Sequence, residues 1–453
     1  MYRFFRVVLA TALLAPAVVR ADTEEEIRRK VIEDLKPFIE QEVQRRVKEA
    51  LAAQTAAAPA QPVTAPPRSS TWSPSDPLTI ARAGPAYMNV SVVGTMALGW
   101  STTPDVEAIN GAHHDPSQRG FTLQGAELAL DGAVDPYFKG LVTIPLVIEP
   151  GGETIVELEE AWLQTTSLPW NLQVKAGQMF ANFGRHNLQH AHQWSFVDQS
   201  IVITRLLGAD GLRNPGGQVS WLAPTPFYTE ISLGVFNSDG ETAAGFRSEE
   251  SGDIHGGVPA ETRLRGPQDL LYVPRIAASF DLSETQTLLL GVSGAFGPNN
   301  SGTQADTQIY GADLYWKWRP TNADKGFPFV AWQTEALLRR YDAAGRETAD
   351  DPPQTLPGET LSDWGIYSQI LWGFRRGWVA GLRGEWLSGD TGAFASDLRV
   401  DRTRIAPNLT WYPTEFSKLR WQYNYDHIQG TGDEHSIWMQ LEFLLGAHAA
   451  HKF

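Results

Sequence analysis

The feature that most constrains this chain is a regular alternation of polar and apolar residues in segments of about ten residues. In the clearest segment, one set is Lys418, Arg420, Gln422, Asn424 and Asp426, and the other is Leu419, Trp421, Tyr423, Tyr425 and His427. Successive side chains of a strand point to opposite faces. A soluble core does not accommodate the first set, and water does not favour the second. A strand between lipid and an aqueous lumen accommodates both.

From Tyr87 to the C-terminus the sequence contains about sixteen such segments, although the apolar parity changes partway through 121–131. Short turns are expected near 131–136, 167–171, 223–227, 281–285, 375–378 and 412–416, and long polar connections over 101–118, 184–215, 238–272, 343–361 and 388–401. The connection near 149–153 is the exception, because it is short where a long one is expected. Short turns on one side and long loops on the other are typical of outer-membrane barrels. We therefore predict an all-β protein whose residues 85–453 form a 16-stranded antiparallel transmembrane β-barrel.

Composition excludes several classes of protein. The chain has no cysteine, which excludes thiol catalysis, disulfide frameworks and cysteine-based zinc sites. Lys and Arg number 37 against 52 Asp and Glu, a formal charge of −15, so nucleic acid is not an expected partner. Beyond the N-terminus there is no apolar run of about 18 residues, which excludes a multi-pass helical membrane protein. No cofactor is predicted.

The N-terminal part divides into three segments. Residues 1–21 combine Arg3 and Arg6, an apolar core and a small residue at Ala21, and this order predicts a secretory signal peptide. Residues 22–54 carry an apolar residue at every fourth position from Ile27 to Leu51, which predicts a periplasmic amphipathic helix. Residues 55–84 are rich in Ala and Pro and are predicted to be an extended linker.

A single apolar stripe on the helix 22–54 needs something to pack against. A coiled coil between subunits, packing on another protein or a membrane surface, and a solvated single helix all remain open. In the first two cases this helix could couple the barrel to the cell wall or to a periplasmic partner.

Residues 174–220 carry a motif around the longest of the early loops. A strand end containing Gly177, Gln178, Phe183 and Gly184 leads into the loop, and glycines follow at Gly208, Gly211, Gly216 and Gly217. This arrangement resembles the phosphate-selective porin (porin O and P) family of Gram-negative outer membranes. The resemblance covers this segment directly and the rest of the barrel only through the strand count.

The resemblance implies an outer-membrane homotrimer with one pore per subunit and a third external loop folded inward as a constriction. Counted from Tyr87, the connection 184–215 follows the fifth segment and is therefore the third external loop. Phosphate selectivity is not carried across, because it depends on dense lysine and arginine rows. Removal of Arg3, Arg6 and Arg20 with the signal takes the formal charge from −15 to −18.

In a pore, selectivity comes from charges at the narrowest point. Strand parity turns Arg383, Arg404 and Arg420 inward from three consecutive segments. Two interpretations are open: the three guanidiniums form one cationic patch, or Glu385, Asp426 and loop carboxylates neutralise them. In both cases they are expected to line water.

The inward loop supplies the other candidate selectivity residues, which are Arg185, His186, His190, His192, Asp198, Arg205, Asp210 and Arg213. His190 and His192 share a face if the loop is extended, so they are also candidates for a divalent metal, with hydrogen bonding inside a packed loop as the other interpretation. His113 and His114 belong to the first long loop and are predicted at the surface.

The sequence therefore predicts an outer-membrane porin that passes small hydrophilic solutes or ions by passive diffusion through the constriction formed by 184–215. The acidic balance predicts a preference for cations or neutral solutes. One alternative is a structural tether of the envelope through the N-terminal helix. Another is a barrel enzyme, for which Ser195 near His192 is the only neighbouring Ser-His pair in the loop.

Overall fold

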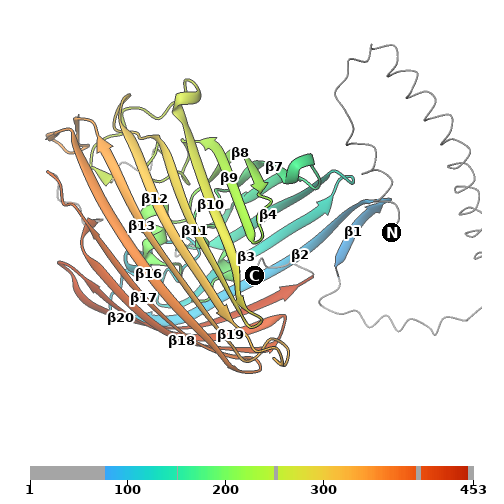
Figure 1. Cartoon of the computed structure of the whole chain (residues 1–453). Helices are drawn as coiled ribbons and strands as arrows, with labels where there is room; N and C mark the ends of the chain where they lie inside the picture. Colours follow the sequence, from blue (N-terminus) through green and yellow to red (C-terminus); the bar gives the residue numbers. More distant parts are fainter. Residues whose placement is uncertain (1–76, 150, 249–253, 394–398, 447–453) are drawn as a thin grey trace, which may run out of the picture. The chain divides into compact units, whose positions relative to one another are not determined.

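The computed structural model describes residues 77–149, 151–248, 254–393 and 399–446 (Figure 1). The predicted signal peptide, the helix 22–54 and the linker up to residue 76 lie outside these residues. The strands are β1 Leu78–Ala83, β2 Ala86–Ser101, β3 Gly120–Ala133, β4 Phe138–Ile148, β5 Thr154–Val156, β6 Glu160–Thr165, β7 Leu172–Phe180, β8 Arg213–Leu222, β9 Tyr228–Asn237, β10 Leu270–Ser283, β11 Gln286–Pro298, β12 Asp306–Trp318, β13 Phe329–Ala343, β14 Arg346–Glu347, β15 Thr355–Leu356, β16 Glu359–Arg375, β17 Trp378–Gly389, β18 Arg402–Thr414, β19 Ser417–Ile428 and β20 Gly432–Leu445. The short helices are α3 Glu107–Asn110, η1 Pro169–Asn171, η2 His186–Leu188, η3 Ala191–Gln193, α4 Ile201–Leu207 and η5 Pro267–Asp269.

Within the described residues, one sheet of 18 strands closes into a barrel. Strand β2 pairs with β3 on one side and with β20 on the other, which joins the two ends of the chain's strand order. Strands β5 and β6 both pair with β4 and act as one interrupted barrel strand. Because β1 takes the place beside β2 where β20 has ended, the ring has sixteen antiparallel strands, as predicted.

Strand β1 contradicts the prediction that all of residues 55–84 form a linker. Its partners on β2 run from Val90 to Ala86, whereas the β20 partners begin at Val92. An unpaired stretch of β2 would expose backbone donors and acceptors, and β1 supplies the partners. The C-terminal part of the predicted linker 55–84 is therefore a strand of the sheet.

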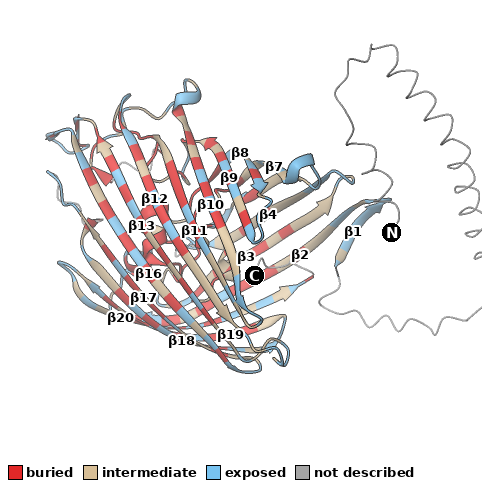
Figure 2. Ribbon diagram, in the orientation of Figure 1, coloured by how far each residue is buried: buried red, intermediate tan, exposed pale blue. Residues whose placement is uncertain are grey.

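Buried and exposed residues alternate along the strands, which is visible as banding on β12, β13 and β16 (Figure 2). On β19 the predicted inward set from Lys418 to Asp426 is buried, and Trp421 and Tyr423 on the other face are exposed. The parity change within 121–131 has a structural cause. Thr95 pairs with Gly125 but Met96 pairs with Leu123, so Gln124 is an extra residue in β3. Such a β-bulge reverses the side-chain alternation.

The connections alternate in length as predicted. Long ones cover 102–119, 181–212, 238–269, 344–358 and 390–401 at one end of the barrel, and short turns cover 134–137, 166–171, 223–227, 284–285, 376–377 and 415–416 at the other. The connections 149–153, 299–305 and 429–431 are short at the loop end, and 319–328 is longer at the turn end. The segment 181–212 is the third connection at the loop end, as the strand count predicted.

The barrel encloses an apolar core. This core was not predicted from the sequence, because a porin is expected to have a polar lumen. Loop residues Ile201, Val202 and Leu206 are at most 2% exposed and pack in one cluster with inward residues of β9 to β17, among them Ile309 and Tyr367. Helix α4 contributes most of the loop side of this cluster.

Helix α4 forms although its sequence, IVITRLL, contains β-branched residues that favour helices weakly. The Ser200 side chain accepts a hydrogen bond from the Val202 amide at its start, and Gly208 ends it with φ of 108°. Packing against the barrel wall therefore decides the local conformation. In the described part of the chain, no helix is long and apolar enough to cross a membrane.

The outer face of β11 and β12 allows a test of the barrel's orientation toward lipid. Leu290 is 41% exposed and pairs with Leu314, away from the strand ends, whereas the outward Gln308 lies near the loop end of β12. Leu290→Arg should lower the free energy of unfolding in lipid vesicles by about 2–4 kcal/mol, and Gln308→Arg by about 0–1 kcal/mol. Denaturant titration in vesicles measures both, and equal effects would contradict an apolar face buried in lipid.

Candidate functional site: the inward loop and its attachments

The loop 181–212 is fixed to the barrel wall by the carboxylate of Asp198, which is 0% exposed. Its Oδ1 accepts from Arg383 Nη2 at 2.6 Å and its Oδ2 from Arg404 Nη1 at 2.9 Å. Gln422 and Asn424 donate to the same two oxygens at 2.8 and 2.7 Å. Burial raises the pKa of Asp198, but the two guanidiniums and the hydrogen bond from Gln422 lower it by more, so its net pKa lies below the usual value. The carboxylate is therefore ionised in the folded protein.

The same network neutralises two of the three predicted arginines, Arg383 and Arg404. Arg383 Nε also contacts Glu385 Oε1 at 2.7 Å, and Arg404 Nε lies 2.9 Å from Asp426 Oδ1. Glu385 in turn accepts from the Ser200 hydroxyl at 2.6 Å. For Arg383 and Arg404 the interpretation as salt bridges with Glu385, Asp426 and a loop carboxylate thus holds.

Arg420 does not join Arg383 and Arg404. It pairs with Thr410 while Arg404 pairs with Asp426, so Arg404 and Arg420 are separated by six positions along the strands, roughly 20 Å. Its guanidinium binds loop carbonyls instead, Phe196 O at 2.8 Å and Trp194 O at 3.0 Å. The three arginines are 0–2% exposed, so the expectation that they line water is wrong: the loop covers them.

Two further predicted residues, Arg205 in α4 and Arg213 at the start of β8, hold the C-terminal part of the loop. Arg205 Nη1 donates to Val400 O at 2.7 Å, and its Nε lies 3.6 Å from Asp363. Arg213 is 1% exposed and is paired with Glu157. Both arginines therefore hold the loop in place rather than present a free charge.

Arg185 and His186 attach the start of the loop to β13. Both backbone amides donate to Glu335, at 3.2 and 2.8 Å. Arg185 lies with its guanidinium carbon 3.9 Å from the Tyr315 ring centroid and remains half-buried. The His186 ring is buried and stacks on Trp194 at 5.7 Å. Burial, and next the charge of Arg383, lowers the pKa of His186 to about 3.

His190 and His192 are held by wall carboxylates. His190 Nδ1 lies 2.5 Å from Glu159 Oε2 and its Nε2 lies 3.0 Å from Glu160 Oε2. His192 Nδ1 lies 3.0 Å from Glu127 Oε2. Burial lowers the pKa of His190, but the two glutamates raise it more, so the net pKa lies well above its usual value.

The Ser-His pair considered for an enzyme has other contacts. His192 directs Nδ1 to Glu127, and Ser195 contributes its carbonyl oxygen to Asn408 at 2.8 Å. Through these contacts, both residues pack the loop against the barrel wall.

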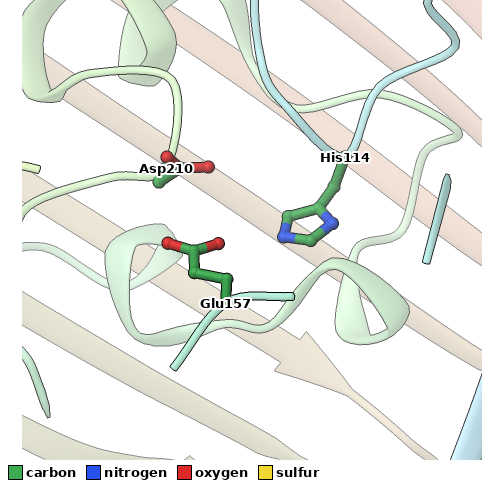
Figure 3. Close-up of side chains that lie close together, drawn as sticks. All are labelled: His114, Glu157 and Asp210. Carbon is green, nitrogen blue, oxygen red and sulfur yellow. The ribbon is translucent and has the colours of Figure 1, made fainter. Parts of the chain in front are cut away.

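A second His-carboxylate group lies at the edge of the loop. Figure 3 shows the His114 ring and the carboxylates of Glu157 and Asp210 facing one another. His114 is 7% exposed, so its predicted surface position is wrong, whereas the neighbouring His113 side chain is 63% exposed, as predicted. His114 is buried because the loop 102–119 also folds inward. The contact that shows this is the hydrogen bond that Ile109 O in this loop accepts from Arg404 on the wall, at 2.9 Å.

Sequence reasoning missed the wall carboxylates that hold the loop, which are Glu127, Glu159, Glu160 and Glu335. A signal did exist for Glu335, because it shares the inward parity of Gln333 and Arg339 on β13. Glu127 follows the bulge in β3 and Glu159 lies between two strand pieces, so simple alternation could not place either of them.

Comparisons with known proteins give one relative that covers most of the chain. An uncharacterized protein of Aquifex aeolicus is 34% identical over 356 residues, which are 74% of this chain and 71% of that protein. The chain belongs to the family of this Aquifex protein. No family model matches the sequence.

The structural neighbours of this family member are outer-membrane porins. The outer-membrane channel DcaP of Acinetobacter baumannii matches with a TM-score of 0.55 at 11% identity, covering 80% of this chain and 99% of that one. An anion-selective porin from Comamonas acidovorans matches with a TM-score of 0.49 at 7% identity, covering 80% and 100%. At these identities the DcaP likeness shows the porin barrel fold alone.

The Asp198 network predicts a large effect of one charge. Asp198→Asn leaves two buried guanidiniums without one of their carboxylates and should lower the free energy of unfolding by about 3 kcal/mol. The matched control is Asp342→Asn in the exposed pair with Arg340 (3.4 Å), which should cost less than about 1 kcal/mol. Denaturant titration compares the two, and equal losses would contradict the role of Asp198.

The low pKa of His186 predicts a pH dependence. The folded pKa of about 3 lies below the ordinary histidine pKa of 6.5, so between these values the unfolded chain binds a proton that the folded protein does not. This contribution to stability is complete above pH 6.5 and is lost as the pH falls toward 3, by up to about 1.4 kcal/mol per pH unit. His186→Gln should flatten this slope in unfolding titrations at several pH values. An unchanged slope, or the same flattening in the exposed His427→Gln, would contradict it.

Proposed function

We propose that the protein is an outer-membrane channel of the porin type, which passes small hydrophilic solutes or ions by passive diffusion. The observation that carries the proposal is a loop, 181–212, fixed across the interior of a sixteen-stranded barrel whose outer face exposes apolar side chains. An apolar exterior suits lipid, and an inward loop narrows the lumen. The corresponding location is the outer membrane of a Gram-negative cell.

The solute path is proposed to run past inward side chains that the loop leaves half-buried. These are Arg185, Lys175, Lys317 and Glu230. They replace the covered arginines Arg383, Arg404 and Arg420 as the candidate selectivity residues, because charges act on a solute only where water and solute reach them. Both signs are present, so the overall acidity of the chain does not by itself set the preference.

Three finer features belong to this proposal. Membership in the phosphate-selective porin family rests on the resemblance of residues 174–220, and a homotrimer follows from that resemblance. A periplasmic coiled coil over 22–54, preceded by a signal peptide, rests on the apolar pattern and the order of the N-terminal residues. A tether to the cell wall through this helix is the alternative function, and it is compatible with transport.

The test is single-channel conductance of the purified protein in a planar bilayer, with candidate solutes added as blockers. We expect discrete current steps that particular small hydrophilic solutes reduce. A flat current from protein that is shown to be folded by a heat-modifiable gel shift would contradict the channel and favour the tether or an enzyme.

Charge removal at Arg185 tests the proposed path. In a salt gradient, Arg185→Gln should shift the reversal potential toward cation preference, because one positive charge leaves the passage. The matched control is Arg340→Gln, whose side chain is on the outer face and 54% exposed. Identical reversal potentials in the wild type and both variants would exclude Arg185 from the path.

A further inference from the structure

We propose that Glu127, Glu159 and His190 form a binding site for one divalent transition-metal ion, which ties the inward loop to the barrel wall. One ligand atom from each residue lies within 4.8 Å of the others. The three come from separate elements: β3, the junction between β5 and β6, and the loop between η2 and η3. An ion between them would therefore link the loop to two parts of the wall.

The three candidate ligands are buried, with exposures of 8% for Glu127, 5% for Glu159 and 6% for His190. A third carboxylate, Glu160, lies 3.0 Å from His190 Nε2 and is 5% exposed. Burial of several carboxylates in one place is costly unless cations compensate them. Without an ion, His190 and Lys175 supply that compensation, with Lys175 Nζ 3.3 Å from Glu160 Oε1. A divalent cation bound at His190 Nδ1 would displace the proton of that nitrogen, while Nε2 would keep its hydrogen bond to Glu160.

A small cavity of about 20 Å³ is lined by two of the three ligands, Glu127 and Glu159, and by His114 and His192, whereas His190 lies outside its lining. This volume is sufficient for one water molecule or one ion. His114 Nε2 lies 3.9 Å from Glu159 Oε1, and His192 Nδ1 lies 3.0 Å from Glu127 Oε2. Both imidazoles are thus placed to complete the coordination or to orient the carboxylates.

The donor set indicates the class of metal. Imidazole nitrogen together with carboxylate oxygen suits zinc and its first-row neighbours, whereas calcium and magnesium prefer oxygen alone. In a tetrahedral zinc site, neighbouring ligand atoms lie about 3.3 Å apart. Since His190 Nδ1 and Glu159 Oε2 are 2.5 Å apart, binding requires these two side chains to separate by less than about 1 Å.

The group His114, Glu157 and Asp210 in Figure 3 has a similar spacing but a different charge environment. Arg213 pairs with Glu157 and lies 3.9 Å from Asp210. A guanidinium at two of the three ligands opposes a second cation, so the proposal is placed at Glu127, Glu159 and His190. Metal binding there goes beyond the proposed channel function, and its test does not depend on transport.

The experiment measures metal content directly. The full chain is refolded in detergent from metal-free denaturant with added Zn²⁺, excess ion is removed, and zinc per chain is determined by elemental analysis. We expect about one zinc ion per chain and at least about tenfold weaker binding in Glu127→Gln and His190→Gln. The matched control is His427→Gln, which alters an exposed His-carboxylate pair (His427 Nδ1 to Asp433 Oδ1, 2.6 Å) and should retain zinc.

Two results would overturn the proposal. One is wild-type protein that is folded by its gel shift but holds no zinc above background. The other is loss of zinc in His427→Gln with retention in the two site variants, which would place the ion at the surface. If the site variants do not fold, X-ray absorption of wild-type protein loaded with Zn²⁺ decides: imidazole scattering at the metal supports the site, and an all-oxygen shell contradicts it.

Discussion

The buried carboxylate of Asp198 is the interaction on which the arrangement of the lumen depends. Arg383 and Arg404 are 0–1% exposed, and burial of both guanidiniums beneath the loop is costly unless an acid is brought to them in addition to Glu385 and Asp426 on the wall. The loop delivers that acid, and wall residues Gln422 and Asn424 occupy its remaining acceptor sites. The wall charges of Arg383 and Arg404 are thus balanced where the loop covers them.

Apolar packing fixes the other side of the loop. Helix α4 contributes a stripe of aliphatic residues to a cluster with the inward faces of β9 to β17. Within the described residues the barrel therefore combines two environments, lipid-facing apolar strands outside and a small protein core inside. The proposed passage is limited to the interior that neither attachment covers, and half-buried Arg185 and Lys317 lie there.

The barrel could be predicted from sequence because strand alternation is a local property. The odd or even position of a residue in its strand determines whether its side chain lies on the inner or the outer face of the sheet. The sixteen strands, the inward set on β19 and the inward turn of Arg383, Arg404 and Arg420 follow from it. The contacts of those arginines could not be predicted, because Asp198 lies more than 180 positions from Arg383 in the sequence. Helix α4 was missed for the same reason, since it forms against wall residues distant in sequence. Strand β1 pairs with the next strand, β2, and was missed because its residues read as a linker, whereas the bulge at Gln124 was visible in the sequence as the parity change within 121–131.

The central claim is that the loop lies inside the barrel against the wall, and an engineered disulfide tests it most directly. The chain has no cysteine, and a Cβ atom added at Gly365 on β16 would lie 2.9 Å from Val202 Cγ1 on α4. Oxidation of the Val202→Cys, Gly365→Cys protein in vesicles should form an intramolecular crosslink, detected by gel mobility after full denaturation. Val202→Cys with Gly384→Cys, where the added Cβ meets nothing within 4 Å, should not crosslink. Absence of the first crosslink in folded protein, or equal crosslinking in both pairs, would contradict the account.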